Sequence, residues 1–177
     1  SFDLINSTVS GNVAVGNDAF GGGILARDGR VQITNSTITA NSSGSGGGGI
    51  AAIDTESPPL ASGSLTLDNS IVAANDGPVQ SLDLLVSLSD PAKLLTRFSL
   101  VGDQSGTSLV ESQQPDGNGN RIGSSIGEGI IDPMLHSLSD NGGAIPTHMP
   151  MSGSPAIDSG DDKLAAAPNG TALQFDG

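Results

Sequence analysis

Residues 31–41, VQITNSTITAN, form the stretch that decides the fold. Both VQI at residues 31–33 and TIT at residues 37–39 alternate side chains with a period of two, which predicts two short strands, each with one face turned inward. Asn35 separates the two strands and Asn41 follows the second. Asparagine tolerates the positive φ of a tight corner better than most residues do. The stretch therefore predicts two strands joined by a sharp bend.

The same stretch occurs three times in the chain. It is preceded by FDLINSTVSGN at residues 2–12 and followed by LTLDNSIVAAN at residues 65–75. A second element, GGGI, occurs at residues 21–24 and again at residues 47–50. Aligned on the central asparagine, the copies give five columns: Phe2, Val31 and Leu65; Leu4, Ile33 and Leu67; Asn6, Asn35 and Asn69; Val9, Ile38 and Val72; Asn12, Asn41 and Asn75.

The spacing between the copies reduces to a fixed unit. The central asparagines are 29 and 34 residues apart. The interval from Asn35 to Asn41 is 6 residues, that from Asn41 to Ile50 is 9 and that from Ile24 to Asn35 is 11, which together make a unit of 26 residues. The first copy carries three extra residues before Ile24, and the second carries eight extra residues within DTESPPLASG at residues 54–63. Insertions that fall in turns over a fixed unit are typical of solenoid proteins.

We therefore predict an all-β fold, namely a right-handed parallel β-helix with three short strands per coil and an irregular C-terminal cap. Coils stacked about 4.8 Å apart would place like residues on one another. A column of asparagines can then hydrogen-bond amide to amide, and we expect two such structural ladders. The ladder residues are Asn6, Asn35 and Asn69 at one corner and Asn12, Asn41 and Asn75 at the next. Loop asparagines in an ordinary β-sandwich are the alternative.

We expect a single domain. Residues 1–129 would form coils with loop insertions near residues 13–20, 54–63 and 76–97, and residues 130–177 would form the last coil and the cap. The motif FSLV that begins at Phe98 resembles the NSIV of the third copy and predicts a further coil with a changed corner. The best helical window, PAKLLTR, would make at most two turns within the third insertion.

The composition excludes several classes of partner. The chain of 177 residues has a formal charge of −13, and its six lysines and arginines are scattered. Phosphate backbones bind through clustered cations, so we expect no nucleic-acid partner. No run approaches 18 apolar residues, so we expect no membrane insertion.

Two chemistries are worth testing in these residues. Asp116, Asn118 and Asn120 supply oxygens at alternate positions, as in the opening of a calcium loop, although a Gly/Asn corner explains the same pattern without a metal. We therefore predict no cofactor, with calcium as the alternative. Arg97 with Asp103 is a candidate charged pair, but no column of carboxylates recurs in register, so we lean against an enzyme.

The repeats resemble those of polymorphic outer-membrane-type and pectin-lyase-like β-helix proteins. The ending is similar to that of bacterial "choice-of-anchor Q" surface proteins, in the run DPMLHSLSDNGG at residues 132–143 and GSPAIDSGD at residues 153–161. This resemblance implies a large protein that is secreted or held at the cell surface by a separate anchor.

The expected function is that of a non-catalytic structural or adhesive segment of such a protein. The alternative is a β-helix that binds or processes carbohydrate. Because Phe2 reads as the middle of a strand, we expect an open edge of unpaired amides at the N-terminal end. Other coils of the same larger protein, or neighbouring copies, would cover that edge, and surface glycans are further candidate partners.

Overall fold

The computed structural model describes residues 1–55, 63–78 and 80–165. These residues form an all-β fold in which every strand of the four sheets pairs in parallel with its neighbours. Helical structure in this part of the chain is limited to a single 3-10 turn, η1 (Pro91–Lys93). None of the described residues belongs to a helix with the length and apolar character needed to cross a bilayer.

The strands repeat in a fixed order along the chain. Sheet A contains β1 (Phe2–Ile5), β5 (Arg30–Thr34), β9 (Ser64–Asp68) and β12 (Leu94–Arg97). Sheet B contains β2 (Thr8–Ser10), β6 (Thr37–Thr39), β10 (Ile71–Val72), β13 (Leu100–Val101) and β14 (Arg121–Ile122). Sheet C contains β4 (Ile24–Arg27), β8 (Ile50–Ile53) and β11 (Leu84–Ser87), and sheet D contains β3 (Val13–Ala14) and β7 (Ser42–Ser43).

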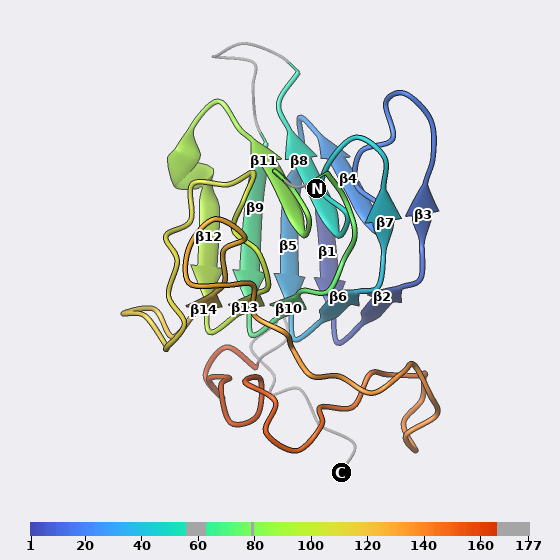
Figure 1. Ribbon diagram of the computed structural model, residues 1–177, viewed down its shortest axis with the longest axis vertical. Helices are drawn as coiled ribbons and strands as arrows, with labels where there is room; N and C mark the ends of the chain where they lie inside the picture. Colours follow the sequence, from blue (N-terminus) through green and yellow to red (C-terminus); the bar gives the residue numbers. More distant parts are fainter. Residues whose placement is uncertain (56–62, 79, 166–177) are drawn as a thin grey trace.

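We call residues 2–27 the first pass, 30–53 the second, 64–87 the third and 94–101 the fourth. Each pass contributes one strand in turn to successive sheets, and each strand lies beside its counterpart from the next pass. In Figure 1 the passes follow one another from right to left, from the blue strands of the first pass to the yellow-green strands of the fourth.

The predicted register is confirmed by the strand pairings. Leu4 pairs with Ile33, which pairs with Leu67, so one inward column runs through three passes of sheet A. In sheet B, Val72 pairs with Val101, as the resemblance between NSIV and FSLV predicts. The repeat therefore sets which residues stack.

The core consists of these inward aliphatic columns. Ile33, Leu67 and Ile38 have no exposed surface, whereas Gln32 on the opposite face of β5 is partly exposed. Alternation with a period of two thus places Ile, Leu and Val inside a narrow interior, and the buried cluster formed by the described residues includes no aromatic side chain. The buried members of this cluster are Val31, Ile33, Ile38, Ile50, Ala52, Leu65, Leu67, Val72, Leu84, Leu94, Val101 and Ile122.

Two expectations about the strands are corrected by the structure. Three strands were expected in each coil, but the first two passes also contain β3 and β7, two-residue strands too short to give a sequence signal. β3 takes up the first residues of the predicted insertion at 13–20.

The predicted insertion at 76–97 is not a loop throughout, because it contains β11, η1 and β12. Leu84 and Leu94 are buried there and pair with Ile50 and Leu65. Pro91 and the Asp90 cap limit the helical window to one short turn, after which the chain is extended. Most of the insertion predicted at 54–63 lies outside the described residues.

Residues 130–165, the C-terminal segment, lie along the outer face of sheet B, below the strands in Figure 1. Ile131 and Ala156 pack there against Ile71, Ala73 and Leu100. The segment has isolated antiparallel bridges, such as Leu135 with Pro150, in place of extended strands. It reaches from the fourth pass back to the first, where His148 Nε2 lies 2.8 Å from Ser10 Oγ.

The corner after sheet B is left-handed in three passes, and two of its residues are alanines. Gly11, Ala40 and Ala74 have φ values of 72°, 55° and 56°. A Cβ in this conformation costs about 1 kcal/mol, and both alanine side chains are exposed, so they gain little packing in return.

We expect Ala40→Gly and Ala74→Gly each to raise the free energy of unfolding by about 0.5–1 kcal/mol, because glycine removes the strain. Urea denaturation followed by circular dichroism would measure the change. Ala52→Gly is the matched control, since Ala52 is buried in β8, and it should lower stability. A loss of stability in Ala40→Gly similar to that in the control would contradict the inference that the left-handed alanines are strained.

Candidate functional site

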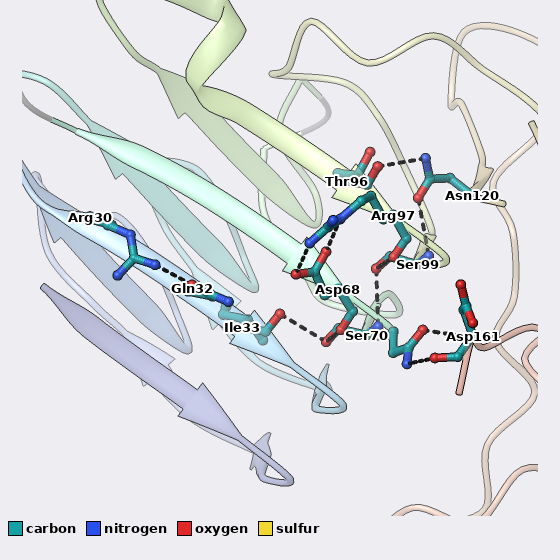
Figure 2. A network of polar contacts seen from close by, with 11 residues as sticks. Arg30, Gln32, Ile33, Asp68, Ser70, Thr96, Arg97, Ser99, Asn120 and Asp161 are labelled. Atoms are coloured by element: carbon teal, nitrogen blue, oxygen red, sulfur yellow. Dashed lines mark hydrogen bonds and ion pairs between the residues drawn. The ribbon is translucent and has the colours of Figure 1, made fainter. Parts of the chain in front are cut away.

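Two columns of polar side chains run through the interior along the corners of sheet B. The first column consists of serines. Each serine Oγ accepts the backbone N–H of the serine one pass earlier, at 3.1 Å for Ser7 to Ser36, 3.2 Å for Ser36 to Ser70 and 3.1 Å for Ser70 to Ser99. The column ends where Ser99 N–H donates to Asn120 Oδ1 at 3.2 Å. Figure 2 shows this last part of the column, from Ser70 through Ser99 to Asn120.

The corner geometry explains why a serine stands at each position. The residue before each serine is left-handed, with φ of 47° at Asn6, 48° at Asn35 and at Phe98, and 47° at Asn69. The serine hydroxyl then donates to the carbonyl two residues earlier, as Ser70 does to Asp68 at 2.7 Å. This bond closes the bend locally and turns the oxygen lone pairs toward the neighbouring pass.

The side chains of Asn6, Asn35 and Asn69 are arranged differently from the predicted ladder. The Nδ2 atom of Asn35 is buried without a hydrogen-bond partner among the described residues. Asn69 instead binds the C-terminal segment, where it donates to the Asp161 carbonyl at 2.8 Å and accepts the Asp161 N–H at 2.9 Å. These asparagines supply the left-handed corner, while the serines that follow them join the passes. The recurring Asn-Ser pair was the available sequence signal for this column.

Asn12, Asn41 and Asn75 form the second column. Asn41 Oδ1 accepts both the backbone N–H and the Nδ2 of Asn12, at 3.1 and 2.9 Å, and Asn75 Oδ1 accepts the same two donors from Asn41, each at 3.0 Å. Asn75 in turn donates its N–H and Nδ2 to Asp83 Oδ1, at 3.0 and 2.9 Å. A carboxylate therefore ends this column.

Asp83 is almost completely buried. Removal from water raises the pKa of its carboxyl group from 3.8 to about 6, against the lowering effect of the hydrogen bonds from Asn75. The nearby Asp103 carboxylate raises the pKa further, although the Asp103 backbone N–H donates to Asp83. Sequence reasoning missed Asp83 because it follows Asn75 by only eight residues and does not stand one unit later.

Asp116, Asn118 and Asn120 do come together, in a loop that closes on itself. Asp116 Oδ1 accepts the backbone N–H groups of Asn118 and Asn120, at 2.8 and 2.9 Å. Desolvation raises the pKa of Asp116, but the hydrogen bonds from Asn120 and Asn118 outweigh it and hold the pKa below its ordinary value. Asn120 Nδ2 binds both the Thr96 carbonyl and the Asp116 carboxylate, so the loop ends the serine column.

The Asp116 carboxylate and Asn120 Oδ1, two of the three side chains predicted to bind calcium, therefore accept hydrogen bonds within the protein. In the part of the chain that the structure describes, no three His, Cys, Asp or Glu side chains gather as a metal-binding group.

The predicted pairing of Arg97 with Asp103 is wrong. Arg97 forms a two-pronged ion pair with Asp68, its register partner across β9 and β12, with both N–O distances at 2.7 Å (Figure 2). The Asp68 carboxylate raises the pKa of the Arg97 guanidinium. Asp103 is buried elsewhere and accepts the backbone N–H groups of Ser105 and Ser125, at 3.2 and 2.9 Å. These charged groups stabilise corners and strand pairs.

Among the described residues, the four sheets share one open end. β1, β2, β3 and β4 are the terminal strands of sheets A, B, D and C, and all of them belong to the first pass. Phe2 is 46% exposed although Val31, beside it in the same column, is 2% exposed. A groove of about 440 Å³ lies at this end between β1 and β4, lined by Phe2, Ile24, Leu25, Arg27, Arg30 and Val31.

The opposite end is covered by residues 102–123. Gly106 accepts the Val86 N–H at 2.8 Å at the edge of sheet C, and Asn118 accepts the Phe98 N–H at 2.9 Å beyond sheet A. In sheet B, Ile122 forms an antiparallel bridge with Ser112. Thus the parallel pairing stops at this end and remains open at the first pass.

Two grooves lie between the C-terminal segment and the Asn6–Asn35–Asn69 corners, beside the direct bonds of Asn69 to Asp161. One of about 360 Å³ has Asn69 and Phe98 on one side and Asp158, Asp161 and Asp162 on the other. The second, of about 560 Å³, lies between the corner of the first pass and the bend around Ile145.

Comparisons of the chain with protein-family models, with curated proteins and with solved structures find no match.

We expect Asn41→Ala to lower the free energy of unfolding by about 2–4 kcal/mol, because it leaves buried donors and acceptors unpaired in three passes. Asn12→Ala is the matched control at the exposed start of the same column and should cost less than about 1 kcal/mol. Urea unfolding curves would compare the two variants. Equal losses would show that the column contributes nothing beyond its local turn.

The stability of the protein should also depend on Asp83. Its pKa is about 6 in the folded chain and 3.8 when unperturbed, so the folded state holds this proton more tightly. The stabilisation is fully present below about pH 3.8 and is lost as the pH rises through about 6, by up to about 3 kcal/mol. Unfolding of the native chain and of Asp83→Asn, measured from pH 3 to 7, should give a stability difference that shifts across this window. A difference independent of pH would contradict the raised pKa.

Proposed function

We propose that the chain is a section of a right-handed parallel β-helix that acts as a non-catalytic structural or adhesive segment of a larger secreted or cell-surface protein. The observation that carries the proposal is that all four parallel sheets end on the same pass, with the register kept from pass to pass. Stacked passes of this kind build a stiff rod whose length grows with the number of repeats.

The use of the charged groups supports a structural role. Asp68 binds Arg97, Asp116 binds backbone N–H groups of its own loop, and Asp83 ends a polar column. Acid–base catalysis needs a carboxylate free to reach a substrate proton, and these carboxylates are engaged in holding passes and loops together.

The loops are the parts available for display. Residues 15–18 of the first pass are exposed, with Val15 at 85%. Asp54 holds the start of the next loop, because the Ser89 N–H binds its carboxylate at 2.8 Å and lowers its pKa. Loops fixed on a rigid frame are a common location for binding residues. The strongly acidic composition favours solubility. The resemblance to anchored surface proteins implies a location outside the cell.

The two grooves under the C-terminal segment favour a second candidate, carbohydrate binding. Amides and hydroxyls line both grooves, and the first also has carboxylates and Phe98 in its lining. Sugars are bound by such hydrogen-bonding groups together with an aromatic face.

Binding to a glycan array and release of reducing ends from polygalacturonate and alginate would test the proposal. We expect no turnover, because Asp68, Asp83 and Asp116 are engaged in the fold. Turnover would overturn the structural reading. Glycan binding that is lost in Asp158→Ala, in the first groove, but kept in Asp18→Ala, in the exposed loop, would favour the second candidate.

A further inference from the structure

The two polar columns have a direction. In each of them, the side-chain oxygen of the later pass accepts hydrogen bonds from the column residue of the earlier pass and never the reverse. The bonds that run the other way, such as that from Asn41 Nδ2 to the Val9 carbonyl, end on backbone carbonyls. The last donor of such a column therefore needs a final group that accepts its hydrogen bond without itself having to donate one to a further pass. One column ends on the Asp83 carboxylate and the other on Asn120, whose amide donates to the Asp116 carboxylate.

The same rule leaves acceptors at the other end. In the described residues, Ser7 Oγ donates to the Ile5 carbonyl but accepts no hydrogen bond. Likewise, Asn12 donates to Asn41 Oδ1 and to the Ser10 carbonyl, while its own Oδ1 accepts none. Their column neighbours Ser36 and Asn41 each accept from the pass before them.

The apolar columns end at the same place. Leu4, Val9 and Ile24 are partly exposed, whereas Ile33, Ile38 and Ile50 beside them have no exposed surface. An aliphatic residue is therefore completely buried only where a further pass lies on its open side.

The direction of the columns argues against self-association. Two copies that met at their first passes would bring the free acceptors of one copy against those of the other. Head-to-tail stacking would place the first pass on residues 102–123, where the sheets are covered and the columns end in carboxylates. Neither arrangement supplies the missing donors, and an unpaired buried acceptor costs about 1–3 kcal/mol.

We propose that the first pass is a docking face for one further pass of parallel β-structure. That pass donates a backbone N–H to Ser7 Oγ, and a backbone N–H together with an amide Nδ2 to Asn12 Oδ1. It carries aliphatic side chains over Leu4, Val9 and Ile24. The inference rests on the β-helix proposed above and names its partner surface.

An extended chain tests the proposal. A copy of residues 30–53 followed by Asp-Gly, the connection found at residues 28–29, would be joined to Ser1. Hydrogen–deuterium exchange of the amides in β1, β2 and β4 should slow at least about tenfold relative to the original chain, with exchange in β9 unchanged. The matched control carries Asn41→Asp within the copy, which sets a carboxylate against Asn12 Oδ1 and should give clearly less protection.

Unchanged exchange in the first pass, with the rest of the chain folded, would overturn the proposal. If the extended chain fails to fold, a synthetic peptide of residues 30–53 added to the original chain replaces it, and absence of binding would overturn the proposal in the same way. Sedimentation of the original chain should show a monomer. A dimer protected at the first pass would assign that face to a second copy. Glycan turnover would contradict the proposed function and leave the exchange result intact.

Discussion

Parallel pairing between strands one pass apart is the constraint on which the rest of the structure depends. Backbone hydrogen bonds fix the spacing of the passes, so each inward side chain lies directly over its counterpart. The interior is accordingly narrow and is filled by Ile, Leu and Val. A polar side chain can enter it only where the residues above and below complete its hydrogen bonds, and the serine and asparagine columns meet this condition.

These columns also give the stack an orientation that the aliphatic columns lack. Leucine on isoleucine is equally favourable in either direction, whereas an amide that donates to the next pass needs an acceptor there. The orientation is reflected in the two ends of the molecule. Asp83 and Asp116 end the columns at the covered end, and Ser7 and Asn12 are left as acceptors at the open one. Within the stack the column positions are thus occupied by serine or asparagine, whereas at the covered end the columns finish on a carboxylate.

The sequence predicts the part of the fold that repeats and misses the part that does not. The asparagine alignment predicts the register of Leu4, Ile33 and Leu67, because a period-two pattern on a fixed unit leaves one way to stack. β11 and β12 were missed because their short LLV and LLT runs flank Pro91 and lack the corner asparagine. The serines were overlooked because serine is common in any turn, and its role depends on the oxygen's direction, which only the folded corner fixes. The candidate site was therefore predictable for Asn12, Asn41 and Asn75 and not for Asp83.

The C-terminal segment adds a second asymmetry, across the stack. Along the outward side of sheet B the residue type changes from Thr8 and Thr37 in the first two passes to Ile71 and Leu100 in the next two. The segment matches this change, because it packs Ile131 and Ala156 on the apolar part and makes a polar contact with Ser10 near the first pass. One face of the stack is thus covered by the chain itself. The outer face of sheet A instead carries Asp3, which is exposed, and Gln32, which is partly exposed, so this strand face meets solvent in the first two passes of the described chain.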